Sequence, residues 1–207
     1  MLLYIVRHGE TLYNKERIFQ GAKADSPLTE EGIPVIEKTS EELQDVDFRG
    51  IYVSPQLRAR KTLEIIMNRN KFIQRNNLEP KILEELREID LGDWDGAKIE
   101  TKAQDEQYVN LREFPERYNP TNFEGEDYAS LIQRVDKTFE IIKANNDNED
   151  KVLIAGHGTT LTVMINRLLG YGICDIRRDG IMGNASISIV DIDVEKSISK
   201  LIKWNNN

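Results

Sequence analysis

The sequence is poor in cysteine, with a single one, Cys174, among 207 residues. One thiol cannot form a disulfide within the chain, so packing and hydrogen bonding have to hold the fold together. A chain of this length with 39% hydrophobic residues can bury a sufficient core, and we expect one domain spanning residues 1–207. A protein without intrachain disulfides suits a reducing compartment, which favours a cytoplasmic location.

Long hydrophobic runs and an excess of positive charge are also missing. No apolar stretch approaches the ~20 residues of a membrane-spanning helix, and no basic region precedes a long apolar one at the amino terminus. We therefore expect neither a membrane span nor a signal peptide. The formal net charge is -8, from 28 Lys and Arg against 36 Asp and Glu. This balance argues against a general nucleic-acid binder, which needs surplus cations to neutralise phosphates.

What the chain does contain is an alternation of short apolar runs and amphipathic segments. The apolar runs predict buried strands at residues 2–6, 50–53 and 152–155, with a short extended piece at 82–83. Helical spacing of apolar residues predicts helices over residues 29–43, 59–69, 126–143 and 160–169. The first helix is expected to start at Thr29 as its N-cap and to bury Ile33, Ile36 and Leu43. Polar and aromatic residues in 98–124 predict helices outside the sheet.

The order of these segments predicts an α/β fold. Strands that alternate with helices favour a mostly parallel central sheet with helices on both faces, a three-layer α/β/α sandwich. The last two apolar stretches, 187–192 and 198–204, alternate as strands do, and we expect them to be partly antiparallel.

Histidine is almost as scarce as cysteine, since the chain has only His8 and His157. Each stands beside glycine at a junction between a predicted strand and the following loop. Arg7 precedes the first histidine, and Arg58 follows the second predicted strand. Because the carboxyl ends of parallel strands lie on one edge of a sheet, we expect these four side chains to converge.

Arginine beside histidine suits an anion better than a cation. No His-x-x-x-His or Cys-x-x-Cys spacing occurs, and two arginines would repel a metal, so we expect no metal site and no cofactor. Guanidinium groups match phosphate oxygens, and a neutral imidazole can attack phosphorus to form a phosphohistidine. The arginines and the second histidine would stabilise the equatorial oxygens. A carboxylic acid would then give the departing alkoxide its proton.

In combination these features resemble the histidine phosphatase superfamily, which has the phosphoglycerate mutase-like fold. The resemblance is carried by Arg7, His8, Gly9, Glu10, Thr11, Asn14, Ser54, Pro55, Arg58, Ala59, Thr62, Glu88, Gly92, Trp94, Gly96, Gly156, His157 and Gly158. These positions follow the family order and span residues 1–160, so the match covers most of the chain.

The resemblance implies a role for each matched position. His8 would be the phosphorylated nucleophile, and Glu88 would donate a proton to the leaving group. Arg7, Arg58 and His157 would hold the phosphoryl group. Further phosphate or substrate contacts are expected from Asn14, Gln20, Gly21 and Thr159.

The choice of Glu88 rests on the family pattern alone. From the residues themselves, Asp90, Asp93 and Asp95 are equally available, and we expect those three to be solvated in a loop or to cap a helix. The chain departs from the family twice. The loop from Gln20 to Asp25 has one extra residue, and Asp95 stands where the family usually has Glu.

The resemblance favours the phosphatase branch over the mutases. Mutases usually carry Glu-Arg-His-Tyr-Gly around the acid, whereas residues 88–92 read Glu-Ile-Asp-Leu-Gly and Trp-Asp-Gly follows at 94–96. We therefore expect a metal-independent phosphomonoester hydrolase of the histidine acid phosphatase type, working through a phosphohistidine. A 2,3-bisphosphoglycerate-dependent phosphoglycerate mutase is the alternative within the fold. A non-catalytic binder of phosphorylated ligands is the alternative of another class, although a binder has no need of the acid.

The expected partner is a small phosphate ester, and we expect binding neither to nucleic acid nor to a membrane. The protein is expected to be a monomer or a homodimer. Segment 98–124 is expected to be a helical cap insertion over the site. Its residues do not identify the substrate.

Overall fold

The structure is a computed structural model that describes residues 1–196 and 198–206. A six-stranded sheet in the order β3-β2-β4-β1-β5-β6 forms its centre. The strands are β1 (Leu2–Arg7), β2 (Gly50–Val53), β3 (Lys81–Ile82), β4 (Lys151–Gly156), β5 (Ile187–Asp193) and β6 (Ile198–Asn206). The first four are parallel, whereas β5 is antiparallel to β1, and β6 to β5. The predicted mostly parallel sheet and the antiparallel final strands are confirmed.

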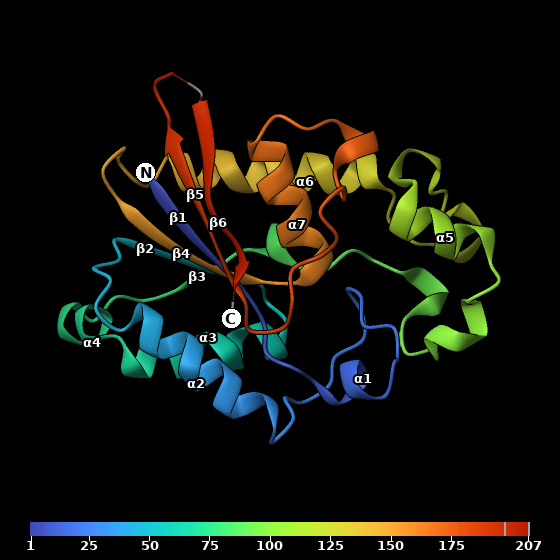
Figure 1. Cartoon of the computed structure of the whole chain (residues 1–207), viewed down its shortest axis with the longest axis horizontal. Helices are drawn as coiled ribbons and strands as arrows, with labels where there is room; N and C mark the ends of the chain where they lie inside the picture. The colour runs from blue at the N-terminus through green and yellow to red at the C-terminus, as the bar shows by residue number, and fades with distance from the viewer. Residues whose placement is uncertain (197, 207) are drawn as a thin grey trace.

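Helices cover both faces of the sheet (Figure 1). The α-helices are α1 (Leu12–Lys15), α2 (Gly32–Leu43), α3 (Leu57–Arg69), α4 (Lys71–Asn76), α5 (Glu106–Glu113), α6 (Tyr128–Lys143) and α7 (Gly158–Leu168). Short 3-10 helices are η1 (Glu84–Leu86), η2 (Gly92–Trp94), η3 (Ile99–Lys102), η4 (Pro115–Arg117), η5 (Thr121–Phe123) and η6 (Ile173–Asp175). Helices α2 and α3 pack on one face and α6 and α7 on the other, which confirms the three layers. Among the described residues, no helix is long and apolar enough to cross a membrane.

Strand β4 shows why both faces have to be covered. From Val152 to Ala155 its side chains are fully buried and alternate between two hydrophobic cores. Val152 and Ile154 join the core under α6 and α7, and Leu153 and Ala155 join the core under α2 and α3. A strand that is apolar on both sides can only be buried by helices on both sides. The polar residues that follow β4 therefore lie at the carboxyl end of the sheet, beyond the two layers of helices.

The start of α2 differs from the expectation. Thr29 is not its N-cap, since the helix begins at Gly32, although the Thr29 hydroxyl still accepts a hydrogen bond from the Gly32 N–H at 2.9 Å. Ile33 is 38% exposed, so its predicted burial was wrong, whereas Ile36 and Leu43 are buried as expected. Ile33 lies in the first turn and borders a surface groove beside Leu57, instead of facing the sheet.

Segment 98–124 forms η3, α5, η4 and η5 outside the sheet, as predicted (Figure 1). It is fastened to the preceding loop by a stack of Trp94 on Phe123, with ring centroids 4.1 Å apart and planes at 12°. Gly92 has a φ of +57°, and a Cβ there would lie 1.7 Å from the carbonyl oxygen of Phe123. Only glycine fits this contact between loop and segment.

Candidate active site

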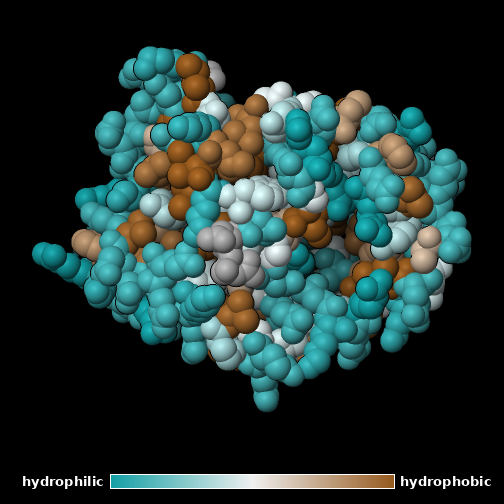
Figure 2. Space-filling view, viewed as in Figure 1, coloured by the Kyte–Doolittle hydropathy of each residue, from teal (hydrophilic) through white to brown (hydrophobic). Residues whose placement is uncertain are grey.

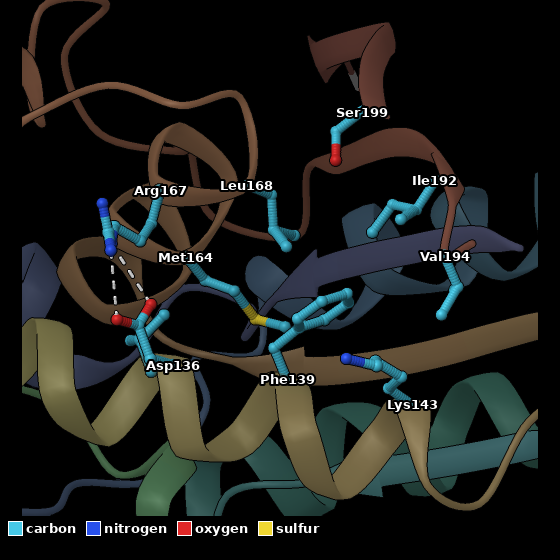
Figure 3. A pocket seen from close by; sticks show the side chains of 10 residues that line it. Asp136, Phe139, Lys143, Met164, Arg167, Leu168, Ile192, Val194 and Ser199 are labelled. Carbon is cyan, nitrogen blue, oxygen red and sulfur yellow. Dashed lines mark hydrogen bonds and ion pairs between the residues drawn. The ribbon is translucent and has the colours of Figure 1, made fainter. Parts of the chain in front are cut away.

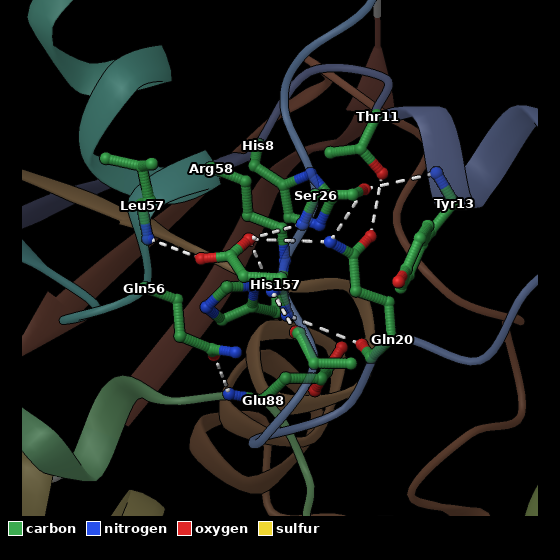
Figure 4. Close-up of polar contacts among 12 residues, drawn as sticks. His8, Thr11, Tyr13, Gln20, Ser26, Gln56, Leu57, Arg58, Glu88 and His157 are labelled. Carbon is green, nitrogen blue, oxygen red and sulfur yellow. Dashed lines mark hydrogen bonds and ion pairs between the residues drawn. The ribbon is translucent and has the colours of Figure 1, made fainter. Parts of the chain in front are cut away.

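The two histidines meet because β1 and β4 are neighbours that end in register. Arg7 pairs with Gly156, so His8 and His157 follow on adjacent strands. The His8 N–H donates to the Gly156 carbonyl oxygen at 2.9 Å, and the two imidazole centroids are 5.3 Å apart. Both rings lie at the centre of the polar cluster in Figure 4. The expected convergence of the histidines is confirmed.

His8 is held as a neutral imidazole with one free lone pair. Its Nδ1 lies 2.7 Å from the Gly9 carbonyl oxygen. A carbonyl can only accept, so Nδ1 carries the proton and Nε2 keeps the lone pair. Burial, together with the charges of Arg7 and Arg58, holds the pKa of His8 well below its usual value. A nucleophilic nitrogen is therefore available at neutral pH.

His157 is completely buried and bound on one side only. Its Nε2 lies 2.6 Å from the Ser54 hydroxyl, whereas its Nδ1 has no hydrogen-bond partner. Burial and then the charge of Arg58 hold the pKa of His157 well below its usual value. Ser54 follows β2, the strand on the other side of β4, so three neighbouring strand ends build this pair.

Arg58 reaches the same place from the first turn of α3, and its side chain is fully buried. Its Nη atoms donate to the carbonyl oxygens of Gln20, Gly21 and Ala24 and to the carboxylate of Asp25. Its Nε has no partner. Burial lowers the pKa of Arg58, and the charge of Asp25 opposes that shift. The loop of residues 20–25 therefore encloses this arginine and leaves one donor unused.

Arg7 completes a set of unsatisfied donors. Its Nη1 donates to the Met182 carbonyl oxygen, and its Nε has no partner. Burial lowers the pKa of Arg7 to about 10, so the guanidinium stays charged at neutral pH. Buried donors without acceptors are rare, because each loses its hydrogen bonds to water. Two such donors, on Arg7 and Arg58, suit an anion with several oxygens, and the unpaired Nδ1 of His157 is a third donor when its Nε2 accepts from the Ser54 hydroxyl.

Glu88 sits at the amino end of α7. Its Oε1 accepts from the Ile89 N–H, the Thr160 N–H and the Thr160 hydroxyl, at 2.9, 3.0 and 2.9 Å. Its Oε2 accepts from the Thr159 N–H at 3.1 Å. Free N–H groups of a helix amino terminus are natural partners for a carboxylate. Oε1 is thus saturated, and Oε2 is the oxygen with capacity left to carry a proton.

The backbone around Glu88 is fixed from α6. Arg134 Nη1 donates to the carbonyl oxygens of Glu85 and Arg87, which both precede Glu88 in the chain. The Arg134 guanidinium also pairs with Glu126 at 2.6 Å, and both side chains are nearly buried. A buried pair of this kind orients its neighbours, because breaking one partner leaves an uncompensated charge.

The other four residues expected to contact phosphate already have hydrogen-bond partners within the protein. The Asn14 Oδ1 accepts from the Thr11 N–H, the Thr11 hydroxyl and Asn184 Nδ2, which directs the Asn14 amide nitrogen elsewhere. The Gln20 side chain is engaged by Thr11, Asp25 and Ser26. The N–H of Gly21 donates to Asp95, and that of Thr159 to Glu88. The phosphate-binding roles of these four residues stay predictions.

Several positioning residues were missed from the sequence. Gln56 links the two site loops, since its Oε1 accepts from the Glu88 N–H and its Nε2 donates to the Gly21 carbonyl oxygen, both at 2.8 Å. Asn184 donates to the carbonyl oxygens of His8 and Gly9. A polar amide between Pro55 and Arg58, at the predicted junction of strand and helix, was a signal that could have pointed to Gln56. Nothing near Asn184 in the sequence marks it.

Asp95 binds the backbone of a non-helical loop, which differs from the expected solvation or helix capping. Its carboxylate accepts from the N–H groups of Gly21, Lys23 and Ala24. Burial raises the pKa of Asp95, and these three hydrogen bonds oppose the shift. The loop with the extra residue is therefore shaped by a side chain that is shorter than the family's usual Glu.

Another cavity, of about 210 Å³, lies between α6, α7 and the β5–β6 pair (Figure 3). Phe139, Met164 and Ile192 form apolar walls, and its charged rim includes the Arg167–Asp136 ion pair at 3.2 Å. The Ile192 N–H bonds to Met1, at the start of β1, so this cavity is at the edge of the sheet opposite His8. Within residues 1–196 and 198–206, no group of three His, Cys, Asp or Glu is placed to hold a metal ion.

Comparison with known proteins agrees with this geometry. The family model of the histidine phosphatase superfamily (branch 1) matches residues 3–207. The protein named "Probable phosphoglycerate mutase GpmB" of Erwinia tasmaniensis is 30% identical over 189 residues, which cover 91% of this chain and 84% of the relative. The adenosylcobalamin/alpha-ribazole phosphatase of Salmonella typhimurium is 30% identical over 171 residues, covering 82% and 80%. The solved structure of Bacillus stearothermophilus YhfR superposes with a TM-score of 0.85 at 29% identity, covering 100% of this chain and 97% of that one.

Proposed function

Because this chain belongs to the histidine phosphatase superfamily, we propose that it is a phosphomonoester hydrolase that forms a phosphohistidine at His8. One observation carries the proposal: a neutral imidazole with a free Nε2 lies among buried donors that lack partners. The donors suit the oxygens of a phosphoryl group, and the lone pair suits attack on its phosphorus.

In the first half of the proposed reaction, His8 Nε2 attacks phosphorus and forms the N–P bond. The ester O–P bond breaks, and Glu88 gives its proton to the departing alkoxide. Arg7, Arg58 and His157 stabilise the charge on the equatorial oxygens through their unused donors. No step needs a metal, since the positive charge is supplied by the two arginines.

In the second half, Glu88 acts as the base. It takes a proton from water while the water oxygen attacks phosphorus, and the N–P bond breaks. Inorganic phosphate leaves, and both His8 and Glu88 return to their starting states. One carboxyl group thus serves as acid and then as base, as microscopic reversibility allows.

The test is to replace His8 by Asn and by Ala and to measure hydrolysis of p-nitrophenyl phosphate. We expect a loss of at least ~1000-fold, because the nucleophile and the covalent step are both removed. Labelled phosphate should be trapped on the wild-type protein after an alkaline quench and be absent from both variants. Full activity in either variant, or a requirement for added divalent metal in the wild type, would contradict the proposal.

Arg58 offers a matched pair with Arg60, which is exposed on the same helix. Arg58→Gln should lower kcat/KM by ~100-fold or more, as expected for a group that stabilises transition-state charge. Arg60→Gln should leave it within ~2-fold, since surface substitutions away from the site have small effects. Equal effects of the two substitutions would show that Arg58 does not contact the phosphoryl group.

A phosphoglycerate mutase is the second candidate, because the relative from Erwinia tasmaniensis bears that name at 30% identity over 91% of this chain. A mutase would interconvert 2- and 3-phosphoglycerate and be stimulated by 2,3-bisphosphoglycerate. A phosphatase would release inorganic phosphate from either isomer without that stimulation. One assay that measures both the isomerised phosphoglycerate and the released inorganic phosphate separates the two activities.

A further inference from the structure

Residues 176–182, which follow η6, contact both α7 and Arg7, one of the proposed phosphate-binding residues. Asn166 on α7 donates to the Ile176 carbonyl oxygen at 2.9 Å, and the Thr162 hydroxyl accepts from the Met182 N–H at 3.1 Å. The Met182 carbonyl oxygen accepts from Arg7. The segment is therefore held along α7, and one end of it contacts the candidate active site.

Arg177 lies within this segment and is fixed by two other elements. Its Nη1 donates to the carbonyl oxygen of Leu111 on α5 and to the hydroxyl of Tyr128 at the start of α6. The Tyr128 hydroxyl donates in turn to the Leu111 carbonyl oxygen at 2.6 Å. These contacts set the plane of the guanidinium. Its Nε is buried without a partner, and no carboxylate of the described residues pairs with Arg177, whereas the neighbouring Arg178 has Asp179.

A second unsatisfied donor lies on a residue that contacts Tyr128. The ring of Tyr118, from segment 98–124, packs edge-on against that of Tyr128, with centroids 5.8 Å apart and planes at 71°. The Tyr118 hydroxyl is buried and has no partner. Burial raises the pKa of Tyr118 well above its usual value, so the hydroxyl remains a donor at neutral pH.

Tyr128, which contacts both Arg177 and Tyr118, also responds to the charge of the proposed proton donor. Burial raises the pKa of Tyr128, the charge of Arg177 opposes this, and the charge of Glu88 adds to it. The Tyr128 hydroxyl is therefore within electrostatic reach of Glu88. Figure 2 shows a hollow on this face of the molecule, between the amino end of α7 and segment 98–124.

We propose that Arg177 and Tyr118 bind a second anionic group of the substrate, so that the enzyme prefers phosphate monoesters that also carry a carboxylate or a second phosphate. The proposal rests on the proposed function, because the reacting phosphoryl group is assigned to the site of His8. An arginine without a carboxylate partner is most readily satisfied by anionic oxygens, which its fork of donors matches. A ligand that supplies them would satisfy two buried groups that otherwise lose hydrogen bonds.

The experiment compares three substrates. Phosphoserine carries a carboxylate, fructose 1,6-bisphosphate a second phosphate, and p-nitrophenyl phosphate neither. Arg177→Gln should lower kcat/KM for one of the first two at least ~10-fold more than for p-nitrophenyl phosphate, mainly through KM. Which of the two responds identifies the second anion. Tyr118→Phe should act in the same direction by a smaller factor, and Arg177→Lys should restore part of the preference because it keeps the charge.

Arg178→Gln is the matched control, since this neighbouring side chain is about half exposed, at 49%, and should leave all three substrates unchanged. Thermal unfolding of each variant shows whether the Leu111 and Tyr128 contacts still hold the fold; should Arg177→Gln not fold, Arg177→Lys and Tyr118→Phe carry the comparison. Equal losses on all three substrates, or no loss on any, would overturn the subsite. Absence of p-nitrophenyl phosphate hydrolysis in the wild type would instead overturn the proposed hydrolase.

Discussion

The carboxylate of Asp25 lies 3.0 Å from Nη1 of Arg58, whose side chain is fully buried, whereas that of Asp25 is 31% exposed. The same carboxylate accepts from the Leu57 N–H at 2.7 Å, at the start of α3. One side chain thus joins the loop with the extra residue to the helix that delivers the arginine. Since both Nη atoms of Arg58 are engaged by this loop, the loop leaves Nε as the donor that can reach the proposed phosphoryl group.

Replacing Asp25 by Ala should therefore impair catalysis more than stability. We expect kcat/KM to fall by ~10–100-fold, because a buried cation loses its partner and its orientation. Steady-state kinetics with p-nitrophenyl phosphate measures the loss. Asp45→Ala is the control, since Asp45 pairs with Lys71 where both side chains are 65% exposed and should change kcat/KM by less than ~2-fold. A wild-type rate in Asp25→Ala would show that the loop does not orient Arg58.

Gln56 should be sensitive to a change that preserves its size. In Gln56→Glu the side chain can still accept from the Glu88 N–H but can no longer donate to the Gly21 carbonyl oxygen. It also places a second carboxylate near Glu88. We expect kcat to fall by ~10-fold and thermal stability to decrease, because the buried Gly21 carbonyl oxygen keeps only its hydrogen bond from Arg58 and faces a carboxylate oxygen in place of a donor. Gln74→Glu, at an exposed position on α4, should have neither effect.

The activity should persist below the usual histidine pKa. Burial and the charges of Arg7 and Arg58 hold the pKa of His8 well below the ordinary ~6.5, so Nε2 remains unprotonated as the pH falls through that value. Profiles of kcat/KM against pH should show no loss attributable to His8 near pH ~6.5. An acid limb centred there would contradict the neutral, buried imidazole.

Unlike the activity, the stability of the fold should decrease as the pH falls below the usual histidine pKa. The pKa values of His8 and His157 are lowered in the folded state, so below pH ~6.5 the unfolded chain binds more protons than the folded one. The free energy of unfolding should fall with decreasing pH by up to ~1.4 kcal/mol per pH unit for each histidine. Urea titrations between pH ~7.5 and ~5.5 measure this slope. His157→Gln should reduce it, and an unchanged slope would show that His157 does not titrate differently on folding.

Alanine substitutions at Gly92 and Gly170 distinguish the cost of backbone strain from the cost of a steric clash. Both have positive φ, +57° and +87°, but a Cβ at Gly92 would meet the Phe123 carbonyl oxygen at 1.7 Å, whereas at Gly170 it would meet nothing. Gly170→Ala should cost about 1 kcal/mol of unfolding free energy. Gly92→Ala should cost at least about 2 kcal/mol more, because backbone has to move. Equal costs in urea unfolding would mean that the loop and segment 98–124 separate easily.

The sequence by itself determined the strands and the residues that follow them. Apolar runs such as 2–6 and 152–155 are local signals, and parallel strands end at one edge whatever the rest of the chain does. These two facts were enough to bring His8 and His157 together. They did not single out Glu88 among the nearby aspartates, because its position depends on the amino end of α7, which lies more than 70 residues further along. That choice came from the family pattern.

Only the tertiary structure decided the proton on His8, the donors left without partners and the residues that hold them. Gln56 meets Gly21 across 35 residues, Asp95 meets the same glycine across 74, and Arg177 meets Leu111 across 66. No periodicity or spacing reports contacts of this range, because they arise when separate loops are packed against one sheet edge. The proposed nucleophile could therefore be predicted from local sequence. The state of its nitrogen, and the second anion subsite inferred beside it, depend on which distant side chains the fold places around it.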